Sequence, residues 1–444
     1  MTQNTDAKKA KRQAIMTAIG CTLVLSYIGG GATLPNIVFP SVCAALDVTV
    51  VQVGWYVLLS TAAAFISGLV GVKLFNFLTP RWTMLAGVIT IAICMVIAGT
   101  AQSLPMFVLS GLFSGFACAC TFPPIASLMS LHFKENSSKL FGLTTGTQVF
   151  IVAGMIKVVG SVLKTRDYRF VMLAAAAIII IVGCSLCFLL LRQPKRKDWI
   201  ARVKEENARK AAASAQHANG AEGVEGDAKG AAGVAGVLDA YNSGLTVKEA
   251  MKTPALYLFS LGMFAGAMIT GAMSSFGSSF FVMFGMTQAE AADMMSLYTL
   301  LCGVHVLWTG FFHTKFGSRI FIIVQYAAII VGVVLLMLWA DSQSAFLVFA
   351  GLFFIAFIKP INSTPAFLVP DLFGRKHYLE FNSLSNGVYY AGICANSQST
   401  SLIMTLLGGV QTLIYLGVVA VVAAAAFMFA LAFSPLKSLQ KPRK

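Results

Sequence analysis

A lysine stands inside one of the most apolar stretches of the chain, the segment FFIAFIKPINSTPAFLVP at 353–370. Lys359 is followed directly by Pro360, which has no backbone N–H and clashes with the preceding helical turn. Carbonyl groups near 356–361 therefore lose their helical partners and must be satisfied by neighbouring side chains or by water. We expect a bent, water-facing stretch of helix here. The polar side chains that it offers are Lys359, Asn362, Ser363 and Thr364.

Two further titratable side chains lie in apolar segments, Lys157 in VAGMIKVVGSVL and His305 in LLCGVHVLWTGFF. An ionisable group deep in a bilayer costs at least ~2.5–3.5 kcal/mol, so each of them needs a reason to be there. Lys157 either snorkels outward along its four-carbon stem or faces a cavity. His305 is either a hydrogen-bonded packing residue or a proton-carrying group. Lys359 lies about ten residues, ~15 Å, from the nearer end of its segment, so snorkelling is harder for it.

Acidic side chains are missing from the middle of the same segments. None of the 17 Asp and Glu residues falls there, since Asp293 and Glu380 lie near segment ends. Lys359 therefore has no obvious carboxylate partner within the chain, and a buried cation without one suits an anionic ligand. The pattern disfavours a site for cationic compounds, which would need a buried acid. It leaves exchange, facilitated diffusion or proton-linked movement through His305 as ways of coupling.

Membrane-spanning helices must carry these side chains. Of 444 residues, 57% are hydrophobic and 11% are charged, whereas a soluble domain carries roughly a quarter charged residues. Continuous apolar runs of about 20 residues can cross a hydrocarbon core of about 30 Å as helices. The sequence predicts an all-α membrane protein with twelve transmembrane helices. Their expected ranges are 14–38, 51–75, 82–101, 104–131, 139–163, 169–191, 255–284, 288–312, 319–340, 344–368, 379–404 and 409–433.

The net charge of +15 is not spread evenly. Lysine and arginine gather before the first run, after every second run and at the end of the chain. This positive-inside pattern predicts a multi-pass protein of the cell (inner) membrane with both termini in the cytoplasm. One basic loop, 163–169, falls on the opposite side. Basic clusters confined to short loops argue against nucleic acid as a partner.

A long polar loop divides the twelve predicted helices into six and six. Residues 192–250 are rich in Ala and Gly and poor in large apolar residues, so we expect a partly disordered cytoplasmic linker. The halves are then 1–191 and 251–444. They share an aromatic spacing, because Phe133 and Phe141 correspond to Phe373 and Phe381. Weak internal symmetry of this kind is typical of membrane proteins built from repeated halves.

Other polar side chains in the apolar segments are weaker candidates for a binding site. They are Tyr27, Asn36, Gln148, Asn386, Tyr389 and Tyr390. The nine cysteines are scattered, and their spacing suggests neither zinc nor a disulfide framework. No GxxxxGK[ST], HExxH or GxSxG motif is present, so we expect no enzyme activity, no cofactor and no metal.

The loops after the second and eighth predicted helices resemble the signature G-x-x-x-D-R-x-G-R-R of the major facilitator superfamily. In the loop after the eighth predicted helix, Thr314 stands where the signature has aspartate. In the loop after the second predicted helix, Phe75 and Leu78 replace Asp and Gly. The resemblance implies that these loops carry gating contacts between the halves. The matching residues are Gly71, Arg81, Gly310, Lys315, Gly317 and Arg319.

Finer features resemble the oxalate/formate antiporter and monocarboxylate transporter branch of that superfamily. They are TVKEAMKTPALYLF before the seventh helix, HFKENSSKLFGLTTG around the fourth and fifth, and PDLFGRKHY after the tenth. The branch often carries an arginine in its eighth helix, where this chain has only His305 as a titratable group.

The resemblance and Lys359 together predict a monomeric secondary transporter working by alternating access. Its cargo would be a small organic anion, a mono- or dicarboxylate, moved in exchange for another anion or together with H⁺. Lys157 and His305 would assist Lys359. The alternatives are a drug or amphiphile exporter of the same fold and a membrane sensor that binds a ligand without moving it.

Overall fold

The structure is a computed structural model that describes residues 2–77, 79–121, 124–125, 128–129, 133, 137–191, 244–374 and 377–435. All regular structure in this described part is helical. Most of the predicted linker, residues 192–243, lies outside it, as do residues 122–123, 126–127 and 130–131 of the predicted fourth helix.

Ten helical segments of the described part are long and apolar enough to cross a membrane. Two more complete the set: α5 (Leu104–Ala119) is apolar but shorter, and α17 (Tyr378–Leu406) is long but more polar. The predicted all-α architecture of twelve spans is confirmed. The other spanning elements are α1 (Thr2–Ile37), α3 (Val50–Phe77), α4 (Pro80–Thr100), α7 (Ser137–Leu163), α8 (Tyr168–Ile178) continued by η2 (Ile179–Gly183) and α9 (Cys184–Leu189), α13 (Pro254–Met283), α14 (Gln288–Ser342), α15 (Ala345–Ile355) continued by η3 (Ala356–Ser363) and α16 (Thr364–Phe373), and α18 (Gly409–Ala432).

Helix α14 contains two of these spans, joined at one glycine. Gly317 has φ 77° and ψ 169°, which breaks the helical path between the spans. A left-handed φ of this kind strongly favours glycine, because it has no Cβ. The glycine belongs to the signature loop noted in the sequence, so the sequence located this turn.

The buried apolar side chains form two clusters. One is drawn from residues 21–191 together with Phe276, and the other from residues 250–431 together with Ile37, Val152 and Ile156. We call the helices α1–α9 the N-terminal set and α12–α18 the C-terminal set. The few residues that each set lends to the other's cluster lie where the sets meet.

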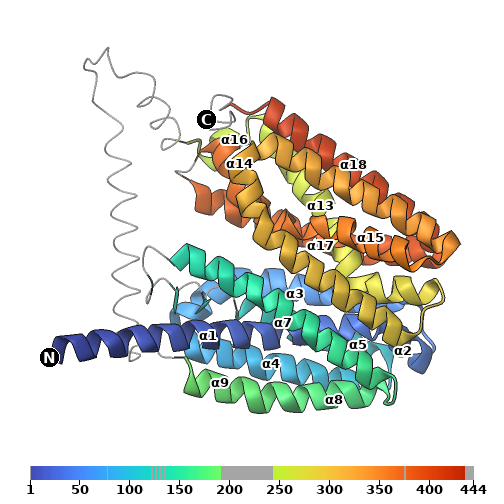
Figure 1. The fold of residues 1–444 in the computed structure, drawn as a ribbon, viewed down its shortest axis with the longest axis horizontal. Helices are drawn as coiled ribbons and strands as arrows, with labels where there is room; N and C mark the ends of the chain where they lie inside the picture. Colours follow the sequence, from blue (N-terminus) through green and yellow to red (C-terminus); the bar gives the residue numbers. More distant parts are fainter. Residues whose placement is uncertain are drawn as a thin grey trace.

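The two sets join at the end of the molecule remote from the start of α1 and the end of α18, and they diverge toward those two points (Figure 1). Helices α7 and α14 converge there. Lys157 of α7 and Asp293 of α14 form an ion pair of 2.8 Å, and the Ser296 hydroxyl donates to the Ala153 carbonyl at 2.7 Å. Beside them, Ser278 of α13 donates to the carbonyl of Asn36 on α1. We call this group of contacts the closed end.

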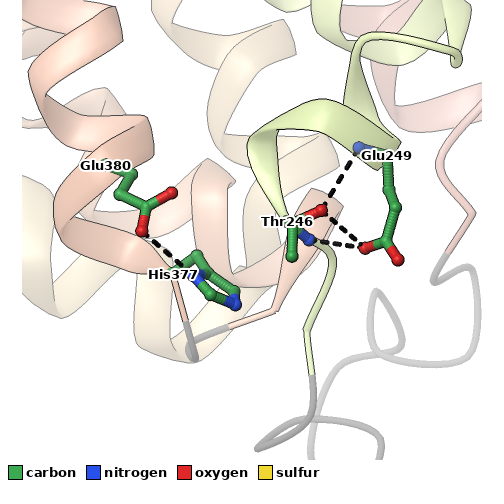
Figure 2. Close-up of polar contacts among 4 residues, drawn as sticks. All are labelled: Thr246, Glu249, His377 and Glu380. Carbon is green, nitrogen blue, oxygen red and sulfur yellow. Dashed lines mark hydrogen bonds and ion pairs between the residues drawn. The ribbon is translucent and has the colours of Figure 1, made fainter. Parts of the chain in front are cut away.

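The C-terminal set begins with the short helix α12 (Val247–Ala250), close to the start of α17 (Figure 2). Thr246 and Glu249 form a capping box, in which the Thr246 backbone N–H donates to Glu249 Oε2 at 2.8 Å. Backbone and hydroxyl hydrogen bonds from Thr246 hold the pKa of the Glu249 carboxyl below its ordinary value. Thr253 occupies the cap position before Pro254, but its hydroxyl donates to the Ala250 carbonyl and makes no cap bond.

Candidate functional site

The predicted bend in the tenth span is present. Helix α15 ends at Ile355, and the chain tightens into the 3₁₀ segment η3, which contains Pro360, before α16 resumes at Thr364. The tightening follows from the missing N–H of proline and its clash with the preceding turn. Lys359 therefore sits on an irregular piece of backbone in the middle of a span.

Lys359 is half-buried and lines a cavity of about 110 Å³ between the two sets. Among the residues that the structure describes, no carboxylate lies within 4.0 Å of its ammonium nitrogen, and no hydrogen bond to it is formed. The N-terminal set contributes Gly29, Thr33, Gln148, Val149 and Val152 to the wall, and the C-terminal set contributes Ser274, Met295, Tyr298, Thr299 and Cys302 beside Lys359.

Three hydroxyl groups of the wall already use their protons within their own helices. Thr33 donates to the Gly29 carbonyl at 2.9 Å, Ser274 to Thr270 at 2.7 Å, and Thr299 to Met295 at 2.7 Å. Each of these oxygens can therefore offer only lone pairs to a ligand. The free donors of the wall are the other polar groups: the Lys359 ammonium, the Gln148 amide and the Tyr298 hydroxyl.

Tyr298 is the most deeply buried of these donors, at 4% exposed. Its hydroxyl makes no hydrogen bond of normal geometry within the described residues, and its polar neighbour is the Cys302 thiol, a weak acceptor. A buried hydroxyl without a good partner costs up to about 1–3 kcal/mol. A ligand that accepts a hydrogen bond in the cavity would remove that cost.

Gln148 reaches the cavity across a glycine. A Cβ atom added at Gly29 would lie 2.2 Å from Gln148 Nε2, which is closer than any real contact. The missing side chain at position 29 therefore leaves the space that the Gln148 amide occupies.

The sequence matches the Major Facilitator Superfamily over residues 19–397. The chain belongs to this superfamily. It is accordingly a multi-pass membrane protein and a secondary transporter, as the predicted resemblance to the superfamily implied. No curated protein matches the sequence, so the predicted oxalate/formate and monocarboxylate branch has no support from a relative.

Solved structures of other transporters have the same fold. A bacterial homologue of the human lysosomal transporter Spinster, in an inward-facing and unoccupied conformation, superposes with a TM-score of 0.67 at 14% identity; the match covers 97% of this chain and 99% of that one. A mutant of the nucleoside transporter NupG gives a TM-score of 0.69 at 15% identity, covering 94% of this chain and 99% of the other. At these identities the likeness concerns the fold alone.

The superfamily's signature residues lie at the end of the molecule where the sets diverge. Arg81 stacks on the Phe188 ring, with Cζ 4.4 Å from the centroid, and donates to the Phe188 carbonyl at 3.3 Å. Lys315 Nζ lies 5.4 Å from the centre of the Phe316 ring, and Arg319 is exposed. Gly71 and Gly310 have helical backbone. The predicted role of these residues in contacts between the halves stays a prediction.

Lys157 and His305 lie outside the wall of the Lys359 cavity in this major facilitator. The Lys157 side chain is 57% exposed, and its ammonium group is paired with Asp293 at the closed end. His305 is buried against the break in the tenth span, where its Nε2–H donates to the Phe353 carbonyl at 3.0 Å. The geometry thus gives neither side chain a direct contact with a ligand at Lys359, which differs from the assisting roles expected from the sequence.

Of the remaining predicted residues, only Gln148 shares the cavity with Lys359. Asn362 is exposed and lies in hydrogen-bonding contact with Tyr389, whose ring is 5.9 Å from that of Tyr390. Asn386 is exposed, and Tyr27 packs beside the N-terminal cluster. The backbone carbonyl of Asn36 accepts the closed-end bond from Ser278.

A stripe of cavity-lining residues on α14 was not predicted from the sequence. Met295, Tyr298, Thr299 and Cys302 recur at helical spacing of three and four residues and all face the cavity. The spacing was visible in the sequence. It could not be distinguished from an ordinary packing face, because the Thr299 hydroxyl bonds to a carbonyl of its own helix and Cys302 is a small side chain.

Proposed function

We propose that this transporter moves a small organic anion, a mono- or dicarboxylate, and that Lys359 is its charge partner. The observation that carries the proposal is the ammonium group of Lys359, which lines the cavity with no acidic partner among the described residues. A lysine at this depth costs at least ~2.5–3.5 kcal/mol on insertion scales. A carboxylate entering the cavity would supply the missing charge partner.

The remaining polar groups of the wall suit the same cargo. The Tyr298 hydroxyl and the Gln148 amide can each donate a hydrogen bond to a carboxylate oxygen. Hydrogen bonds to a charged group are worth about 1.5–3 kcal/mol each, roughly twice those between neutral groups. A cationic compound would meet the ammonium group with no acid to balance it.

We infer that transport proceeds by alternating access between the halves 1–191 and 251–444. The sets meet at the closed end and diverge at the other, and the Spinster homologue with the same fold was solved in an inward-facing conformation. If the basic loops face the cytoplasm of the cell (inner) membrane, the end at which the sets diverge faces inward here. Rocking of one half against the other would open the closed end instead.

Uptake into proteoliposomes tests the cargo. Purified protein is assayed with labelled mono- and dicarboxylates, with and without a pH gradient and with and without internal anion, which separates proton symport from antiport. Lys359→Ala should raise KM for the transported carboxylate about 10–100-fold, since the lost interaction with a charged group is worth about 1.5–3 kcal/mol. Lys359→Arg should keep much of the activity.

Lys164→Ala serves as the control, because this lysine is exposed in the loop after α7. Carboxylate transport that survives Lys359→Ala and Lys359→Gln unchanged would contradict the proposal and favour the exporter of amphiphiles. Binding of a carboxylate without any counterflow would favour the sensor.

A further inference from the structure

The break in the tenth span leaves one particular carbonyl group without its backbone partner. In the 3₁₀ segment η3 the N–H of residue 360 would bond to the carbonyl of Phe357. Residue 360 is proline, so this bond cannot form. A backbone carbonyl within a membrane span then needs a side chain or cavity water as its partner.

Side chains from α14 meet this carbonyl and the one before it. Gln325 Nε2 donates to the Phe357 carbonyl at 3.0 Å, and the Cys302 thiol donates to the Ala356 carbonyl at 3.9 Å. His305 Nε2 donates to a third carbonyl, that of Phe353, where the α-helix gives way to the 3₁₀ segment. Cys302 and His305 precede the Gly317 turn and Gln325 follows it, so both spans of α14 contribute.

These three side chains are held firmly. Cys302 and Gln325 are 1% exposed and His305 is 4% exposed. The His305 ring lies 3.8 Å from the Phe357 ring and 5.1 Å from the Phe353 ring, centre to centre. A carbonyl can only accept, so the Phe353 contact requires a proton on His305 Nε2 in either protonation state.

We propose that His305, Gln325 and Cys302 are positioning residues that hold the broken span in the shape that turns Lys359 toward the cavity. Lys359 lies two residues after Phe357 and directly before Pro360, within the capped segment. Cys302 contacts both sides of the arrangement, because it caps Ala356 and also lines the cavity. His305 thereby acts on the site through the backbone of η3. The link to transport rests on the proposed function, whereas the caps themselves do not.

Four variants distinguish the effect of the side-chain hydrogen bonds to the η3 carbonyls from the effects of the His305 ring and of general packing. His305→Phe keeps an aromatic ring and removes the donor, and His305→Gln keeps a donor near the position of Nε2. Gln325→Met keeps the length of the side chain and removes its amide. Thr309→Val is the matched control, since Thr309 is 3% exposed on the same helix and its hydroxyl donates to the His305 carbonyl one turn away, within its own helix.

Hydrogen exchange on the full-length protein in nanodiscs is the first measurement. In His305→Phe and Gln325→Met, amides of 357–364 should exchange about three- to tenfold faster than in the parent, the effect of one lost hydrogen bond. Amides of α18 should be unchanged. His305→Gln should restore much of the protection, and Thr309→Val should behave like the parent. Unchanged exchange at 357–364 in both cap variants would overturn the proposal.

Carboxylate uptake is the second measurement, and it tests the link to Lys359. A displaced ammonium group should raise KM several-fold in His305→Phe and Gln325→Met while kcat changes less than twofold, with rescue by His305→Gln. Equal KM values in the parent and the cap variants would overturn the positioning role. If the parent protein transports no carboxylate, the proposed function fails, and hydrogen exchange alone then decides whether the caps exist.

Discussion

Lys157 and Lys359 carry the same ammonium group in different surroundings. Lys157 is 57% exposed and is paired with Asp293 on the opposite set of helices. Lys359 is half-buried beside a cavity, with no acidic partner among the described residues. The first arrangement joins two parts of the protein, whereas the second leaves a charge for a ligand to neutralise. Only their surroundings in the fold distinguish them.

Gly29→Ala tests whether the Gln148 amide takes part in binding. The new Cβ would lie 2.2 Å from Gln148 Nε2, so this flexible side chain must move away from the cavity wall. We expect KM for the transported anion to rise about 3–10-fold, with little loss of folded protein, because a net hydrogen bond is worth about 0.5–1.5 kcal/mol. Proteoliposome uptake and thermal unfolding measure the two effects.

The matched control is Gly154→Ala, on the same helix as Gln148. A Cβ at Gly154 meets no atom within 4 Å. Its KM should equal that of the parent. An equal KM in Gly29→Ala and Gly154→Ala would remove Gln148 from the site.

Single residues were predictable from the sequence where their chemistry conflicts with a membrane. A lysine before a proline in an apolar run stands out, and both the bend and the cavity-lining position of Lys359 followed from it. Tyr298, Thr299 and Thr33 did not stand out. Hydroxyl groups that can bond to their own helix are tolerated on any face of a span, so the sequence does not reveal which of them face a cavity.

At the scale of helices, the ends were harder to locate than the breaks. The tenth span was expected to end at 368, whereas α16 continues to Phe373. Hydropathy reports where the chain leaves the lipid, and a helix can continue into water beyond that point. The bend at Pro360 was located, because it depends on a backbone property of proline. The turn at Gly317 falls in the gap expected between the helices 288–312 and 319–340.

The pairing of α7 with α14 leads to a prediction about the closed end. Asp293→Asn removes the ion pair with Lys157. A pair whose lysine is 57% and whose aspartate is 22% exposed is worth about 1 kcal/mol, so the population with the closed end open should rise by up to about fivefold. Lys157→Gln should act in the same direction. The distance between spin labels at the exposed positions Val158 and Met283 reports the change by double electron–electron resonance.

Asp341→Asn is the control, since Asp341 is an exposed acid at the end of α14 and belongs to none of the closed-end contacts. It should leave the label distances as they are in the parent. If both Asp293→Asn and Lys157→Gln also keep the parent distances, the ion pair does not help to hold the end closed.

At the scale of the molecule, two clusters of buried apolar side chains meet through a small number of residues. The number of spans and the family were predictable, because both depend on patterns repeated along the whole chain. The arrangement at the closed end was not. Contacts such as Ser278 with Asn36 join residues far apart in the sequence through a backbone carbonyl, and a carbonyl leaves no trace in the residue pattern.

A reversible lock across the two sets tests the rocking motion directly. The Cβ of Ala292 lies 2.9 Å from where a Cβ at Gly160 would be, and disulfides span about 3.5–4.5 Å between Cβ atoms, so a shift of less than ~1 Å admits the bond. In the double variant Gly160→Cys/Ala292→Cys, oxidation should reduce transport at least about tenfold, and reduction should restore it. The single variants and the parent, whose own cysteines in the described part are unpaired, should not respond to oxidation.

The locked protein should still bind its anion, because the bond lies at the closed end and leaves the end where the sets diverge free to admit the ligand. Binding measured by thermal shift or calorimetry should therefore survive oxidation while counterflow is lost. This combination is expected only if the closed end must open once in every cycle, since a fixed pore or a side entrance would bypass the bond. Full transport by the oxidised double variant, with the disulfide verified by mass spectrometry, would rule out rocking at this end.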